Sequence, residues 1–151
     1  IALGTVANKQ GRVAGINLGG GHATFQGVVG TAITKVCSLE VARTGLTMAE
    51  ARHEGFHPVA VSIDAKTTAG YMPDAQTMTV RLIAQRGTGR LLGGQIVGGP
   101  GSAKRIDTVA TALHAHLRVD DVIDLDLAYA PPFSSPWDPV AVAARVLASE
   151  V

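Results

Sequence analysis

The sequence predicts an α+β domain with a mainly antiparallel sheet of about five strands and helices on one side. Three observations lead to this fold class. Residues 57–65 alternate between apolar and polar side chains, as a half-buried strand does. Residues 78–85 and 91–97 are strand-like runs joined by five residues with two glycines, which is typical of a hairpin. Over residues 102–117 an apolar stripe at helical spacing predicts a helix that covers the sheet, formed by Ile106, Val109, Ala110, Leu113 and Leu117.

The first third of the chain contains a helix, two strands and a second, short helix. A helix is expected over 5–18, ended by the run Gly19–Gly21. Strands are expected at 28–36 and 39–44 because β-branched and small residues predominate there. Thr47 and Glu50 have the spacing of a capping box, which predicts a short helix that ends before Gly55.

Capping signals predict the helices that follow the three later strands. Ser102 is expected to cap the helix that carries the apolar stripe, and Asp120 or Asp121 to cap a short turn after it. The last helix begins where Asp138 precedes Pro139, a residue that fits the first helical position since its missing N–H costs nothing there.

Composition excludes several classes of function. The 151 residues suffice for one domain with a core, and 46% of them are apolar. A net charge of +1 argues against a nucleic-acid partner, and no apolar run reaches the length of a membrane span. A single cysteine fits a reducing compartment, so a cytoplasmic location is expected. The chain opens with Ile1 and shows no secretory signal, and we expect it to be a piece of a longer protein.

Local motifs do not provide a self-contained active site. No metal site is expected, because His114 and His116 point to different sides of a helix and the other histidines lack partners at ligand spacing. Cys37 ends an apolar strand, which favours a buried structural thiol over a nucleophile. The glycine-rich run 94–101 lacks the order of a dinucleotide fingerprint, so a tight turn is favoured over a phosphate cradle.

The stretch LDLAYAPPFSSPWDP, residues 125–139, is the most unusual in the chain. Pro131 and Pro132 fix φ and remove backbone donors, so a rigid loop is expected rather than a strand or helix. Two interpretations remain open. The loop either packs its own aromatic side chains at the surface or presents the hydroxyl of Tyr129 for function.

Four segments of the chain are similar to one known family. They are ALGTVANKQGRVAG (2–15), GVVGTAITKVCSLEVARTGLT (27–47), LLGGQIVGGPGSAKRIDTVATAL (91–113) and LDLAYAPPFSSPWDPV (125–140). Together they resemble the C-terminal part of flavin-dependent pyridine nucleotide-disulfide oxidoreductases, in particular coenzyme A-disulfide reductase and NADH oxidase. The resemblance implies that residues 1–21 are the terminal helix of an FAD-binding domain and residues 22–151 a dimerisation domain, the interface domain of a flavoprotein reductase. FAD and NAD(P)H would bind to the full-length protein, while this fragment alone is expected to bind no cofactor and to be inactive.

The resemblance also implies roles for particular residues. In such homodimers the interface domain covers the partner's active site, and the positions of two tyrosines that approach coenzyme A disulfide there match Tyr71 and Tyr129. The backbone amides of Val6, Ala7 and Asn8 would face the flavin from the start of the first helix. Cys37 does not occupy the position of the family's redox cysteine, which lies near the N-terminus of those proteins.

Two other functions remain open beside coenzyme A-disulfide reduction. The same scaffold serves NADH oxidases, which reduce oxygen or peroxide. The chain would alternatively be a non-catalytic interaction module if no flavin-binding domains accompany it. The glutathione reductase branch of the family is disfavoured, because its C-terminal histidine and glutamate have no counterparts in residues 129–138.

Overall fold

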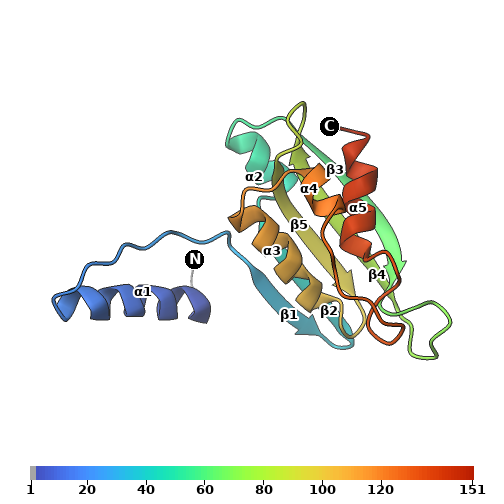
Figure 1. Cartoon of the computed structure of the whole chain (residues 1–151), viewed down its shortest axis with the longest axis horizontal. Coiled ribbons are helices and arrows are strands. Elements are labelled where there is room, and N and C mark those ends of the chain that lie inside the picture. The colour runs from blue at the N-terminus through green and yellow to red at the C-terminus, as the bar shows by residue number, and fades with distance from the viewer. Residues whose placement is uncertain (1–2) are drawn as a thin grey trace.

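The computed structural model describes residues 3–151, and within them five strands and five α-helices form the fold (Figure 1). The helices are α1 (Gly4–Leu18), α2 (Met48–His53), α3 (Ile106–His114), α4 (Val119–Ile123) and α5 (Pro139–Ala148), with a 3-10 turn, η1 (Ala103–Arg105), before α3. The strands are β1 (Ala32–Val36), β2 (Leu39–Gly45), β3 (Pro58–Lys66), β4 (Thr77–Gln85) and β5 (Leu91–Gly98).

All five strands belong to one antiparallel sheet with the order β1-β2-β5-β4-β3. The hairpin between β4 and β5 forms as the sequence predicts, and Ile96 of β5 lies between Ala42 of β2 and Val80 of β4. The α+β fold with an antiparallel sheet of five strands is therefore confirmed.

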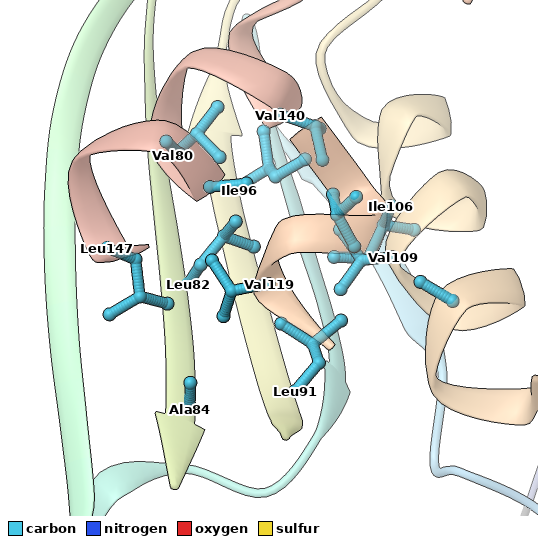
Figure 2. Close-up of a cluster of buried hydrophobic side chains, with 14 of the residues drawn as sticks. Val80, Leu82, Ala84, Leu91, Ile96, Ile106, Val109, Val119, Val140 and Leu147 are labelled. Carbon is cyan, nitrogen blue, oxygen red and sulfur yellow. The ribbon is translucent and has the colours of Figure 1, made fainter. Parts of the chain in front are cut away.

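The main core lies between the sheet and α3, α4 and α5, which cover one face of it (Figure 1). Figure 2 shows its side chains converging from the central strands β4 and β5 and from the three helices. Leu82, Ile96 and Val109 are fully buried there. Each such side chain contributes roughly 1.5–3 kcal/mol by leaving water, so this layer supplies most of the stability of the domain.

The short helix α2 packs against residues outside the main core. Ala51 of α2 forms a smaller cluster with Ile83 and Leu92, and Ile83 points away from the face that Leu82 occupies. The predicted capping box is present, because the Thr47 hydroxyl accepts from the Glu50 amide and the Glu50 carboxylate accepts from the Thr47 amide. Gly55, with a φ of 81°, ends the helix as predicted.

Two predicted boundaries differ from the structure. The strand predicted from residue 28 begins at Ala32, because Gly27 and Gly30 take positive φ values and interrupt extended pairing. The helix predicted to Leu117 ends at His114, although Leu117 packs on the core as its place in the stripe predicts. His116, with a φ of 56°, ends α3 in a Schellman motif, in which the Leu117 amide donates to Ala112 and the His116 amide to Leu113.

Of the two aspartates expected to cap the short turn, Asp121 does so from the first turn of α4, because its carboxylate accepts a hydrogen bond from the Arg118 amide at 2.7 Å. Two predictions about single side chains are wrong. Ser102 makes no capping hydrogen bond, because the chain enters α3 through η1 with Ser102 already in a helical conformation. Cys37 is exposed, not buried, because it occupies the tight turn between β1 and β2 with a φ of 53°.

Residues 3–31, which we call the N-terminal arm, extend away from residues 32–151, which we call the body (Figure 1). The arm consists of α1 and an extended segment. Val6 is the one buried residue of α1, so this helix has little to pack against.

Candidate functional site

Two loops lie together at one end of the sheet, and we call them the tyrosine loops. One comprises residues 67–76 between β3 and β4, and the other comprises residues 125–138 between α4 and α5. They are joined directly, because the Ala69 amide donates to the Pro131 carbonyl at 2.9 Å. The fold therefore places Tyr71 and Tyr129, which are 58 positions apart in sequence, on neighbouring loops.

Both tyrosines point into solvent. The side chain of Tyr71 is 76% exposed and that of Tyr129 is 48% exposed. The first loop is closed by Thr67, whose amide donates to the Gln76 carbonyl at 2.9 Å and whose hydroxyl accepts from the Gln76 amide at 3.1 Å. Each phenol is thus presented by a loop with a fixed backbone, which is the arrangement a preorganised donor requires.

The second loop contains no helix or strand, as its prolines predict. Ser134 is buried, its amide donates to the Ala130 carbonyl at 3.1 Å and its hydroxyl to Asp138 at 3.3 Å. Phe133 and Trp137 are exposed, and the guanidinium of Arg145 lies 5.1 Å from the centre of the Trp137 ring. The hypothesis that the loop packs its own aromatic side chains is wrong, because these rings face outward.

Arg105, which the sequence did not single out, lies where the two loops meet the start of α3. Its guanidinium donates four hydrogen bonds, and its side chain is 12% exposed. The acceptors are Thr67 O at 2.8 Å, Phe133 O at 2.6 Å, Gly101 O at 3.0 Å and Asp138 Oδ2 at 3.2 Å. Asp138 also caps α5, as predicted, by accepting from the Val140 amide at 2.8 Å.

Glu40 supports this junction from β2. Its carboxylate accepts from the Ala103 amide at 2.9 Å, at the start of η1. Hydrogen bonds from the backbone that leads into η1, that of Ala103 first, hold the pKa of Glu40 below its usual range. Glu50 has a lowered pKa for a different reason, because the Thr47 amide and hydroxyl and the Arg43 guanidinium stabilise its carboxylate.

The start of α1 presents backbone donors rather than side chains. The amides of Val6 and Ala7 both donate to the Leu3 carbonyl at 3.0 Å, so they are already used within the helix. The first N–H groups of a helix have no carbonyl acceptor within the helix. Because α1 begins at Gly4, the amides that remain to bind a ligand are those of Gly4 and Thr5. The first turn carries no acidic side chain and no side-chain cap, and it suits a ligand edge that develops negative charge.

The remaining candidates give no chemistry in the part of the chain that the structure describes. Residues 3–151 contain no group of three His, Cys, Asp or Glu side chains arranged to hold a metal ion. Within that range no helix combines the length and apolarity that crossing a bilayer requires. In the glycine-rich run 94–101, a Cβ on Gly98 would lie only 2.3 Å from Met78, so glycine is needed there for close packing. Gly101 has a φ of 86°, as the predicted tight turn requires.

These features define an α+β domain that presents exposed aromatic side chains on two loops joined by a backbone hydrogen bond. The model of the family described as pyridine nucleotide-disulphide oxidoreductase, dimerisation domain, matches residues 31–140. The chain belongs to this family. The parent proteins of the family are FAD-dependent oxidoreductases.

Three curated proteins that are similar in sequence to this chain are named as reductases or oxidases. The chain is 43% identical over 147 residues to the NAD(P)H coenzyme A polysulfide/persulfide reductase of Pyrococcus horikoshii, covering 97% of the chain and 33% of that protein. It is 35% identical over 143 residues to an NADH oxidase of Methanocaldococcus jannaschii, covering 95% of the chain and 32% of that protein. Coenzyme A disulfide reductase of Staphylococcus haemolyticus is 33% identical over 120 residues, or 80% of the chain and 27% of that protein.

A solved structure supports the fold in detail. The structure of a NAD-dependent persulfide reductase from A. fulgidus matches 99% of the chain at 41% identity with a TM-score of 0.96, and the match covers 28% of that protein. The chain thus spans about a third of the length of the curated relatives it matches.

Proposed function

We propose that this chain is the dimerisation domain of an FAD- and NAD(P)H-dependent reductase that cleaves the sulfur–sulfur bond of coenzyme A disulfide. In this proposal two copies form a homodimer, and Tyr129 and Tyr71 of each copy reach the active site of the other. The observation that carries the proposal is the pair of exposed phenols on two loops that the Ala69–Pro131 hydrogen bond joins.

The exposed aromatic side chains support a homodimer. Tyr129, Phe133 and Trp137 all lie in one loop and are exposed in the single chain. Exposed aromatic groups are enriched at protein interfaces, because they bury a large area when a partner covers them. A second copy that covers this loop would remove these rings from water and bring the phenols to its own substrate site.

A phenol suits the chemistry of disulfide reduction. When a sulfur–sulfur bond breaks, one sulfur leaves as a thiolate, and a hydrogen-bond donor beside it stabilises the developing charge. The Tyr129 hydroxyl would donate a hydrogen bond to that sulfur. Tyr129 is assigned the main role, because its loop is held through Ser134, Asp138 and Arg105. Tyr71 is more exposed and is assigned a supporting role.

The cofactors would be held mainly by parts of the parent protein outside this chain. FAD accepts electrons from NAD(P)H and supplies them for reduction of the disulfide. This chain would contribute the start of α1, where Val6, Ala7 and Asn8 were expected to face the flavin. Since the Val6 and Ala7 amides donate to Leu3, the amides of Gly4 and Thr5 would point toward the flavin edge. Residues 1–21 would then belong to the FAD-binding domain and residues 22–151 to the dimerisation domain. A cytoplasmic location is part of the proposal, supported by the single cysteine.

The decisive test is Tyr129→Phe in the flavoenzyme that contains this chain. Loss of the hydroxyl is expected to lower turnover of coenzyme A disulfide roughly 100-fold, the scale of a proton-donating group, while NAD(P)H still reduces the flavin at the normal rate. Arg86→Lys, a change at an exposed residue between β4 and β5 and away from both tyrosine loops, is the control and should leave turnover within about twofold. Unchanged turnover in Tyr129→Phe would remove the catalytic assignment.

NADH oxidase activity is the second candidate, because one relative bears that name. It predicts NADH-dependent consumption of oxygen that needs no coenzyme A disulfide. Steady-state rates with each acceptor separate the two activities. A parent that shows neither activity and binds no flavin would favour the non-catalytic interaction module.

A further inference from the structure

Three segments that are distant in sequence meet at Arg105. They are the two tyrosine loops and the turn that leads from β5 into α3. Arg105 donates to a backbone carbonyl in each of them: Thr67 and Phe133 in the tyrosine loops and Gly101 in the turn. Arg105 also donates to the Asp138 carboxylate in the second loop, and the Ala69–Pro131 bond joins the two loops directly.

The geometry needs a guanidinium group. One nitrogen, Nη2, donates to both Thr67 O and Phe133 O, and so a single atom bridges the two loops. The other two nitrogens donate to Gly101 O and Asp138 Oδ2. A planar fork with five donors fills these positions at once, whereas an ammonium group has three donors at one point and cannot reach acceptors on several sides.

The charge of Arg105 is balanced within the junction. With 12% of the Arg105 side chain and 14% of that of Asp138 exposed, both ionic groups are largely withdrawn from water. Asp138 is in turn fixed by the Val140 amide and by the Ser134 hydroxyl of the second loop. On the other side, the Glu40 carboxylate holds η1, which ends at Arg105. Glu40 of β2 thus holds the backbone just before Arg105, and Asp138, the N-cap of α5, holds its guanidinium.

From this junction we infer that Arg105 is a positioning residue for Tyr129 and Tyr71: it fixes the two tyrosine loops relative to each other, so that both phenols reach the same substrate. This inference rests on the proposed function. Arg105 does not touch substrate and acts through the carbonyls of Thr67 and Phe133. Small displacements of a reacting group have large effects on rate, and a loosened junction would lower turnover although both tyrosines remain.

The test is a double-mutant cycle between Arg105→Lys and Tyr129→Phe in the parent flavoenzyme. Lysine keeps the charge beside Asp138 but cannot bridge both loops. Arg105→Lys is expected to lower kcat for coenzyme A disulfide about tenfold without changing flavin reduction by NAD(P)H. In the Tyr129→Phe background the same change should cost less than about twofold, because there is no hydroxyl left to position. A purely structural role predicts equal effects in both backgrounds.

Arg86→Lys is the matched control. Arg86 is exposed on the β4–β5 hairpin, at the opposite end of β4 from the first tyrosine loop, and its replacement should leave every rate unchanged. Hydrogen exchange supplies a readout that does not depend on activity. In Arg105→Lys the Ala69 amide should exchange at least about tenfold faster, while amides of β4 keep their protection.

The outcomes separate the two hypotheses. If Tyr129→Phe leaves turnover unchanged, the catalytic role proposed for Tyr129 fails whatever Arg105→Lys does. If Tyr129→Phe lowers turnover while Arg105→Lys has no effect, or the same effect in both backgrounds, the positioning role fails and the proposed function stands. Unchanged exchange at Ala69 would equally overturn the positioning role.

Discussion

The arm and the body differ in what holds them in place. In α1 only Val6 is buried, and the helix is stabilised by its own backbone hydrogen bonds. The body has a continuous core in which Leu82, Ile96 and Val109 are fully buried between sheet and helices. Long-range packing therefore determines the body, whereas local preference determines the arm. A site that depends on exact loop placement is expected in the body, and the tyrosine loops are indeed there.

The two regions also differ in how much space surrounds their glycines, and the largest predicted effect on stability comes from a crowded glycine in the body. A Cβ on Gly93 of β5 would lie 2.1 Å from the Leu46 carbonyl oxygen, and backbone would have to move to make room. Gly93→Ala should lower the free energy of unfolding of the body by about 3 kcal/mol or more, the upper range for overpacking. Urea unfolding of this chain measures the change. A loss below about 1 kcal/mol would show that β2 and β5 adapt easily.

Acid should destabilise the body and not the arm. Residues 3–31 contain no Asp or Glu, whereas Glu40 and Glu50 in the body have lowered pKa values in the folded state. A carboxyl with a lowered folded pKa contributes stability that is complete above its unfolded pKa and is lost as the pH falls through the folded value. Unfolding free energies measured from about pH 6 to about pH 3 should fall steeply, and less steeply in Glu40→Gln and Glu50→Gln. Glu150→Gln, at the exposed C-terminal end, is the control and should follow the parent curve.

The smallest effect is predicted in the arm. Gly11 of α1 has nothing within 4 Å of a built Cβ, so alanine fits there and favours the helix by up to about 1 kcal/mol. Gly11→Ala should raise the helical signal in circular dichroism without shifting the unfolding transition of the body. A shift of that transition would contradict the separation of the two regions, since it would show that α1 is coupled to the core.

The sequence predicted those features that depend on neighbouring residues. The capping box at Thr47, the Asp138 cap and the order of helices and strands along the chain all have local signals and are confirmed. The end of α3 was missed because His116 takes the left-handed position that glycine usually marks. Cys37 was misplaced for a similar reason, since a tight turn after Val36 exposes it.

The candidate site was only partly predictable. Tyr129 stood out because prolines follow it. The contact between its loop and the loop of Tyr71 depends on how the strands are arranged in the sheet. Arg105 gave no signal, because its four acceptors are backbone carbonyls and a carboxylate between 4 and 38 positions away. Interactions of this kind depend on tertiary structure, and no spacing rule in a single sequence reports them.

The central claim is that Tyr129 of one copy lies in the active site of the other, and photo-crosslinking from position 129 tests it most directly. Two copies of the parent flavoenzyme with different affinity tags would be expressed together, one of them with p-benzoylphenylalanine in place of Tyr129, and the mixed dimers isolated and irradiated. We predict a crosslinked product that carries both tags, formed less when coenzyme A disulfide is bound. Crosslinks confined to the chain that carries the photoreactive group, or no mixed dimers at all, would contradict the account.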